Sequence, residues 1–214
     1  GTLFKMLGSY CVPLLFLLAL AWMADFATGG DMPIPINLLS YAPFLGFFGF
    51  NFYSWLNAVD SPDFLNGLPV RVPQLLRAKI IVYFLMTTWI SVLFLVLMAQ
   101  LLNEWDALLA ALIVMIANSV YIVALSGLLM GLRPNKAIFD TQIMAIFWVA
   151  TVIPLVSLFL LSFTQGNIDL YENWGAGIGD ETATEFTARA DSYFESILAI
   201  SFGLLALGGV FLLM

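Results

Sequence analysis

Six long apolar runs constrain the fold of this chain more than any other feature. They cover approximately residues 3–24, 34–56, 78–102, 107–130, 141–163 and 193–214. A helix of about 20 mostly apolar residues is long enough to cross the hydrocarbon core of a bilayer. Strands of a membrane barrel alternate apolar with polar residues, and these runs do not alternate. The sequence therefore predicts an all-α, polytopic membrane protein with six transmembrane helices, arranged as one domain over residues 1–214.

The composition agrees with a membrane protein and excludes several kinds of chemistry. The chain is 62% hydrophobic and only 10% charged, whereas a soluble domain has about 25% charged residues. Its net charge of −7 argues against a nucleic-acid partner. It contains no histidine and one cysteine, Cys11, so histidine acid–base chemistry, histidine metal sites and an intrachain disulfide are excluded. We predict no catalytic site and no metal site. Because the chain starts at Gly1 and ends inside an apolar run, we expect a piece of a longer protein.

The positive charges predict the orientation in the membrane. If six spans alternate, six of the seven Lys and Arg residues fall on one side, and only Arg189 falls on the other. Most of the acidic residues fall on the side of Arg189. Since Lys and Arg are enriched in cytoplasmic connections, both termini are expected in the cytoplasm. Arg77 and Lys79 would then anchor the start of the third span at the membrane interface.

The outer connections differ in length. Residues 103–106 form a short turn, whereas residues 164–192 form a long and acidic connection. Its second half, residues 180–192, could be helical and lead into the sixth span. The whole segment is either a solvated acidic loop or a short helical pair that covers an outer gate.

The inner connection between the second and third spans, residues 57–79, has the pattern of a compact elbow. Ser61 is a favourable N-cap, Pro62 suits the first helical position, and Asp63 complements the positive end of a helix. Gly67 then favours a helix stop. We therefore expect a short amphipathic helix that lies along the cytoplasmic membrane surface.

Two further signals mark the ends of spans on the same side. Pro73 is suited to begin a helix that continues through Arg77 and Lys79 into the third span. The next inner connection, residues 131–136, also combines a glycine stop, a proline and positive charge. Asp140 is expected to cap the fifth span.

The middle of each span is free of Asp, Glu, Lys and Arg. Ion- and proton-coupled transporters usually need such residues at membrane depth, so their absence disfavours that class, although backbone groups can still bind Na⁺. Asn118, Ser119 and Tyr121 are polar and lie near the middle of the fourth span. They either form hydrogen bonds between helices or line a translocation path.

Glycine and proline add structural detail within the spans. Gly46 and Gly49, and Gly203 with Gly208 and Gly209, allow helices to approach closely, either within the chain or between two copies of it. Pro154 is expected to kink the fifth span because it removes a helical hydrogen bond. The phosphate-binding pattern G-x-x-x-x-G-K-[ST] does not occur, so an ATP-driven function would need a separate subunit.

The inner connections resemble those of a known family. Residues 64–71, FLNGLPVR, followed by residues 75–79, LLRAK, are similar to the segment that leads into the third span of type-2 ABC exporter membrane subunits. Residues 131–135, GLRPN, with Phe139 and Asp140, resemble a second inner loop of archaeal, halophile-type members. Six spans with both ends inside also match that family.

The resemblance implies a permease that takes its energy from another chain. The elbow would be a coupling helix that docks on a cytoplasmic ABC ATPase subunit, and ATP and Mg²⁺ would bind that partner. A second permease half would complete the path across the cell membrane, and this chain could be one half of a longer permease. Substrates of such exporters include lipids, polysaccharides, drugs and peptides. The residues expected to contact the ATPase are Asp63, Phe64, Leu65, Leu68, Arg71 and Gln74 in the elbow region, with Arg133 and Asn135 in the second inner loop.

Other interpretations of the same features remain open. The elbow could be only a surface turn that Arg71, Arg77 and Lys79 anchor at the membrane. The chain could be a small secondary carrier or channel, or a scaffold that binds a partner without transporting anything.

Overall fold

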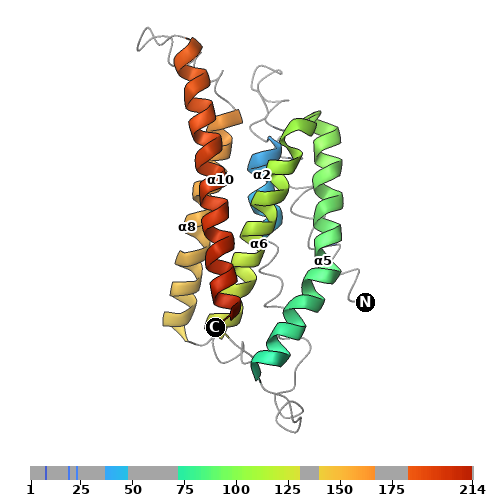
Figure 1. Ribbon diagram of the computed structural model, residues 1–214, viewed down its shortest axis with the longest axis vertical. Coiled ribbons are helices and arrows are strands. Elements are labelled where there is room, and N and C mark those ends of the chain that lie inside the picture. The colour runs from blue at the N-terminus through green and yellow to red at the C-terminus, as the bar shows by residue number, and fades with distance from the viewer. Residues whose placement is uncertain are drawn as a thin grey trace.

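Within the part of the chain that the structure describes, every regular element is a helix (Figure 1). The computed structural model describes residues 37–47, 72–130, 140–166 and 183–213, together with the single positions Gly8, Ala19 and Met23. The helices in chain order are α2 (Leu38–Phe47), α5 (Val72–Leu102), the 3-10 helix η2 (Trp105–Ala107), α6 (Leu108–Met130), α8 (Thr141–Gly166) and α10 (Ala183–Leu213).

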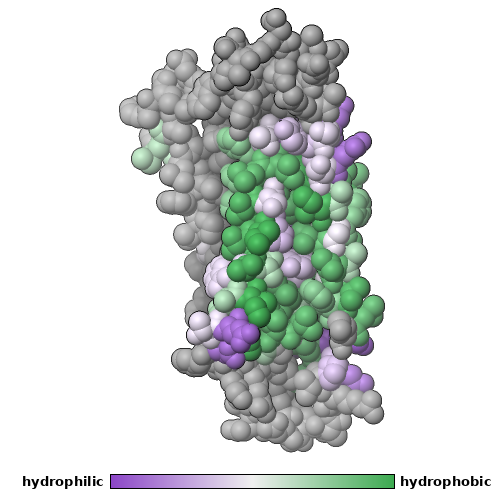
Figure 2. Space-filling view, turned by 90° about the vertical axis from the view of Figure 1, so that its left-hand side faces the viewer, coloured by the Kyte–Doolittle hydropathy of each residue, from purple (hydrophilic) through white to green (hydrophobic). Residues whose placement is uncertain are grey.

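Four of these helical segments are long and apolar enough to cross a membrane. They are Pro73–Leu102, Trp105–Met130, Thr141–Gln165 and Asp191–Leu213. Figure 2 shows that the side of the molecule where α8 and α10 lie is largely apolar, with polar residues towards its two ends. The protein is therefore a multi-pass membrane protein with at least these four candidate spans. They correspond to the third to sixth predicted spans, whereas the first is described only at Gly8, Ala19 and Met23 and the second only at residues 37–47.

The ends of the helices follow the local signals in the sequence. The side chain of Asp140 accepts hydrogen bonds from the backbone N–H groups of Gln142 and Ile143 at 3.0 and 3.3 Å, which confirms it as the N-cap of α8. Asn103 follows α5 with a φ of 56°, and the Glu104 N–H donates to the Ala99 carbonyl at 3.0 Å. A left-handed residue with this bond is a frequent way to end a helix, and it reverses the chain within the predicted short turn.

Two helices extend beyond the predicted spans. α5 begins at Val72, with Pro73 in its first turn, and continues without interruption to Leu102. α10 begins at Ala183, so the end of the long acidic connection is helical and continuous with the last span. The polar stretch before the sixth span is therefore part of that helix rather than a separate loop.

α6 lies at the centre of the described helices. It packs against α2, α5, α8 and α10, and α2 in turn packs against α5 and α8 (Figure 1). α6 is the most buried of the four candidate spans: 61% of its most apolar stretch lies inside the molecule, compared with 17% for α8 and 22% for α10. α2 is buried on nearly every side, and a helix that is apolar all round is expected in such a place.

Candidate functional site

Asn118 on α6 is fully buried and joins α6 to α2. Its side-chain Nδ2 donates a hydrogen bond to the backbone carbonyl of Pro43 at 2.9 Å, and the residue is 0% exposed. Its Oδ1 has no hydrogen-bond partner among the described residues. Asn118 therefore retains one unused hydrogen-bond acceptor inside the bundle. A buried amide oxygen without a partner costs free energy.

Gly46 makes this contact between α2 and α6 close. A Cβ atom at Gly46 would lie 2.7 Å from the Asn118 Cβ and 2.8 Å from the Met115 carbonyl oxygen. Both distances are shorter than a carbon atom tolerates, so only glycine allows the two backbones to lie at this separation. This confirms close helix packing at Gly46 within the chain, as membrane helices commonly achieve with small residues.

Tyr121, one turn further along α6, joins α6 to α8 and α10. Its hydroxyl donates to the backbone carbonyl of Ala150 on α8 at 3.1 Å. Its ring lies 6.4 Å from the ring of Phe211 on α10. A Cβ at Gly208 would lie 3.1 Å from the Tyr121 Cα and N atoms, so α10 also approaches the backbone of α6 closely here.

Thr151 adds a further buried hydroxyl on α8. It is 1% exposed, and its Oγ1 has no hydrogen-bond partner among the described residues. Asn118, Tyr121 and Thr151 are here called the central polar layer. All three are uncharged at neutral pH, so the layer suits the binding of a neutral polar group or the joining of helices by hydrogen bonds.

The three residues predicted to line a path have different environments. Asn118 and Tyr121 both use their side chains in hydrogen bonds between helices, while Ser119 is partly buried. These two bonds agree with the interpretation that the polar residues of the fourth span form hydrogen bonds between helices. Their role in a translocation path stays a prediction.

A second polar group, here called the Glu104 cluster, surrounds the N-terminus of α2. Asn37 caps the helix, because its Oδ1 accepts from the Ser40 N–H at 2.7 Å and its own N–H donates to the Ser40 Oγ at 3.1 Å. The Asn37 Nδ2 donates to the Ser162 carbonyl on α8 at 2.9 Å. The Glu104 carboxylate accepts from the Leu38 N–H at 2.6 Å. This cluster ties together α2, the turn after α5 and the end of α8.

Sequence reasoning did not identify the Glu104 cluster as a site. The spacing of Asn37 and Ser40 is a capping signal that can be recognised in the sequence. The contact of Glu104 with this cap cannot be recognised there, because Glu104 lies 66 residues from Leu38. Its position beside the positive end of α2 is favourable for a carboxylate.

At the opposite end of the bundle, the start of α5 contacts the end of α10. The Arg77 guanidinium donates to the Leu213 carbonyl at 3.3 Å, and a cation is favourable at that helix terminus. Lys79 is buried, whereas Gln74 is exposed on the first turn of α5. The other predicted docking residues lie outside the described residues: Asp63, Phe64, Leu65, Leu68, Arg71, Arg133 and Asn135.

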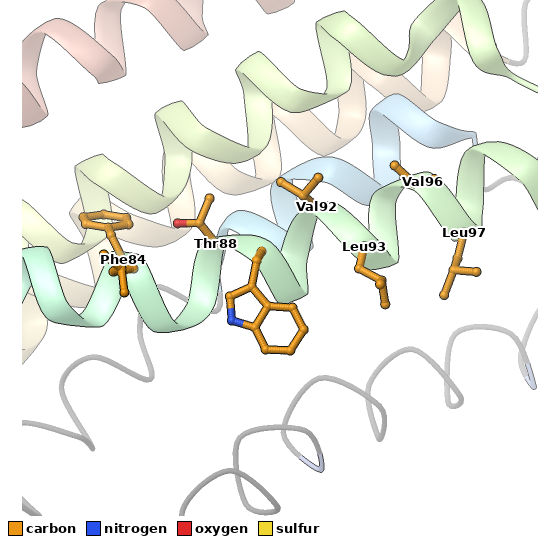
Figure 3. A pocket seen from close by; sticks show the side chains of 8 residues that line it. Phe84, Thr88, Val92, Leu93, Val96 and Leu97 are labelled. Atoms are coloured by element: carbon orange, nitrogen blue, oxygen red, sulfur yellow. The ribbon is translucent and has the colours of Figure 1, made fainter.

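An apolar hollow runs along the face of α5 that is turned away from α2 and α6. Its lining residues are Phe84, Leu85, Thr88, Trp89, Val92, Leu93, Val96 and Leu97. Figure 3 shows the side chains of Leu93 and Leu97 pointing away from the ribbons of α2 and α6. All eight of these described residues come from α5. Such a surface suits acyl chains or another membrane helix.

Across residues 37–47, 72–130, 140–166 and 183–213, no three Cys, Asp or Glu side chains come together as a metal site. Comparison of the chain with protein-family models, with curated proteins and with solved structures finds no match.

Proposed function

We propose that this protein is the membrane subunit of an ATP-driven exporter, in which a separate cytoplasmic ATPase supplies the energy. The observation that carries the proposal is the continuity of α5, one helix of 31 residues from Val72 to Leu102. A force applied where the elbow joins Pro73 would be transmitted through a continuous helix into the membrane. In the proposed function, the ATPase binds the elbow and applies this force.

The contents of the spans support an external energy source. α6 and α8 contain no Asp, Glu, Lys or Arg, and α5 contains them only at Arg77 and Lys79 near its start. A carrier that couples transport to an ion gradient usually has charged residues deep in the membrane. In the proposed function, ATP and Mg²⁺ bind the partner, and the elbow residues with Gln74, Arg133 and Asn135 contact it. A second permease half completes the path in the cell membrane.

The contact between α5 and α10 extends this proposal. Arg77, on the second turn of α5, donates a hydrogen bond to the Leu213 carbonyl at the end of α10. Movement of the start of α5 would therefore also act on α10, which packs along the central helix α6. The two helices would move together in response to the ATPase.

Charge reversal in the elbow should disrupt the association with the ATPase. Purification of the tagged protein from its native membranes is expected to recover an ABC ATPase. Asp63→Lys and Arg71→Glu should each lower the recovered ATPase roughly tenfold, which corresponds to about 1.4 kcal/mol. Quantitative mass spectrometry of the purified complexes would measure this ratio, with Asp106→Lys as the control, since Asp106 is an exposed acidic residue at the opposite end of the bundle.

Other outcomes would favour the alternative functions. Purification without any ATPase, combined with flux through the protein in liposomes without nucleotide, would show a secondary carrier or channel. A stable complex with a different protein, and no flux with or without ATP, would show a scaffold. Equal recovery of the ATPase by the elbow variants and by Asp106→Lys would disprove docking at the elbow.

A further inference from the structure

The hydrogen bond between Tyr121 and Ala150 occurs at a particular place in α8. Ala150 lies four residues before Pro154, which is inside the helix. In a regular helix the Ala150 carbonyl would accept from the N–H of residue 154. Proline has no N–H, so this carbonyl loses its helical partner. The Tyr121 hydroxyl from α6 donates to this same carbonyl at 3.1 Å.

The hydroxyl therefore supplies from a neighbouring helix the bond that α8 cannot make internally. Membrane helices tolerate proline when neighbouring groups satisfy the released carbonyl in this way. The bond holds α8 against α6 at the turn before Pro154, where the helix lacks one of its own hydrogen bonds. Without it, the turn between Ala150 and Pro154 would lack a hydrogen bond at a point where the helix is already weakened.

The side of α8 that faces away from the bundle offers little resistance to movement of its second half. Ile153, Val156 and Leu160 are largely exposed on the outer surface of the helix, where lipid would surround them. Towards the bundle, the second half is held by buried Leu158 and Ser162, by partly buried Leu161, by the ring of Phe159 at 5.2 Å from that of Phe44, and by the bond from Asn37 to the Ser162 carbonyl. A rotation about Pro154 would therefore act mainly on contacts with α2.

The arrangement in which Tyr121 bonds to Ala150, here called the closed state, leaves two buried polar atoms of the central polar layer without hydrogen-bond partners among the described residues. The Thr151 hydroxyl, next to Ala150, is buried without a hydrogen-bond partner among the described residues, and so is the Asn118 Oδ1. Each such atom raises the free energy of the closed state relative to one in which water or a polar ligand reaches it. This reduces the difference in free energy between the closed arrangement and an open one.

We propose that Tyr121 is a latch on a hinge at Pro154. With the latch engaged, the second half of α8, residues 154–166, packs against α2 through the ring of Phe159 on Phe44 and the bond from Asn37 to the Ser162 carbonyl. When Tyr121 releases the Ala150 carbonyl, this half changes its angle to the first half, and the Tyr121 hydroxyl becomes free to bind a polar ligand. Tyr121 is thus a positioning residue that sets the angle of α8 at Pro154. This inference concerns the helices of the chain itself and does not depend on the proposed ATPase.

Hydrogen exchange followed by mass spectrometry on the purified protein would test the latch. Tyr121→Phe removes only the hydroxyl, so amides in residues 154–166 should exchange roughly three- to twentyfold faster, as expected for the loss of one hydrogen bond between membrane helices. Peptides from α5 should be unaffected. Tyr193→Phe removes the same atom from α10, outside the central polar layer, and should leave exchange in α8 unchanged.

A second variant links the effect to the proline. Pro154→Ala restores the N–H, so the Ala150 carbonyl regains a helical partner and no longer depends on Tyr121. In that background Tyr121→Phe should change exchange in α8 by less than about twofold, because no hydrogen bond is lost without replacement. An equal effect of Tyr121→Phe in both backgrounds would overturn the latch. If Pro154→Ala does not fold, the comparison of Tyr121→Phe with Tyr193→Phe still tests the latch. Equal exchange rates in α8 for those two variants would also overturn the latch.

Discussion

Gly46→Ala should lower the free energy of unfolding by about 1 to 3 kcal/mol, the usual cost of forcing an extra carbon into a packed interior. The new Cβ would lie 2.7 Å from the Asn118 Cβ and 2.8 Å from the Met115 carbonyl oxygen. The second of these atoms belongs to the backbone of α6 and cannot rotate away. α2 and α6 must therefore separate, which also lengthens the bond from Asn118 to the Pro43 carbonyl. Reversible unfolding of the purified protein in mixed micelles would measure the change.

The control for this substitution is Gly203→Ala on α10. A Cβ at Gly203 has no atom within 4 Å, so the added methyl group meets only open space. Alanine is favoured over glycine in a helix by about 1 kcal/mol, and this variant should be unchanged or slightly more stable. A loss of stability of equal size in both variants would show that the effect comes from glycine in general rather than from the contact at Gly46.

Glu104→Ala should destabilise the protein by about 2 kcal/mol, within the range for hydrogen bonds to charged groups. The carboxylate accepts from the Leu38 N–H at 2.6 Å, and Leu38 is fully buried. Removal of the carboxylate would leave this N–H without its acceptor at the N-terminus of α2. It would also remove a favourable negative charge from the positive end of the helix.

The same unfolding measurement would test Glu104, with Asp106→Ala as the control. Asp106 is acidic, exposed and only two residues away, so its replacement should change stability by less than about 0.5 kcal/mol, as for most surface substitutions. Glu104→Gln retains an acceptor without the charge, so its free energy of unfolding should lie between those of Glu104→Ala and Asp106→Ala. If Glu104→Ala and Asp106→Ala have the same stability, the bond to Leu38 does not hold the end of α2.

Local patterns allowed parts of the fold to be predicted in detail. Asp140 was predicted to cap the fifth span, and its carboxylate does accept from the first turn of α8. Pro73 was predicted to open the helix of the third span, and α5 begins at Val72. These features depend on the backbone needs of a few adjacent residues, so the sequence contains the information directly.

The candidate site was only partly predictable. Asn118 and Tyr121 stood out as polar residues near the middle of a span, but their partners are the carbonyls of Pro43 and Ala150, 75 and 29 residues away. A mid-span asparagine has the same local pattern whether it faces a path, another helix or a second copy. The Glu104 cluster was missed for the same reason, because Glu104 and the Leu38 N–H meet only in the folded bundle.

The sequence by itself determined that the chain is helical and apolar enough for a membrane, roughly where four of its long helices lie, and that Asp140 caps one of them. Only the tertiary structure decided that α6 is central, that α2 is buried on nearly all sides, and that Tyr121 serves the carbonyl released by Pro154. The reason is physical. Hydropathy and capping act within one helix, whereas lipid tails are as apolar as the side chains of a helix and do not select which face turns inward. That choice depends on close contacts such as Gly46 with Asn118 and on hydrogen bonds between helices.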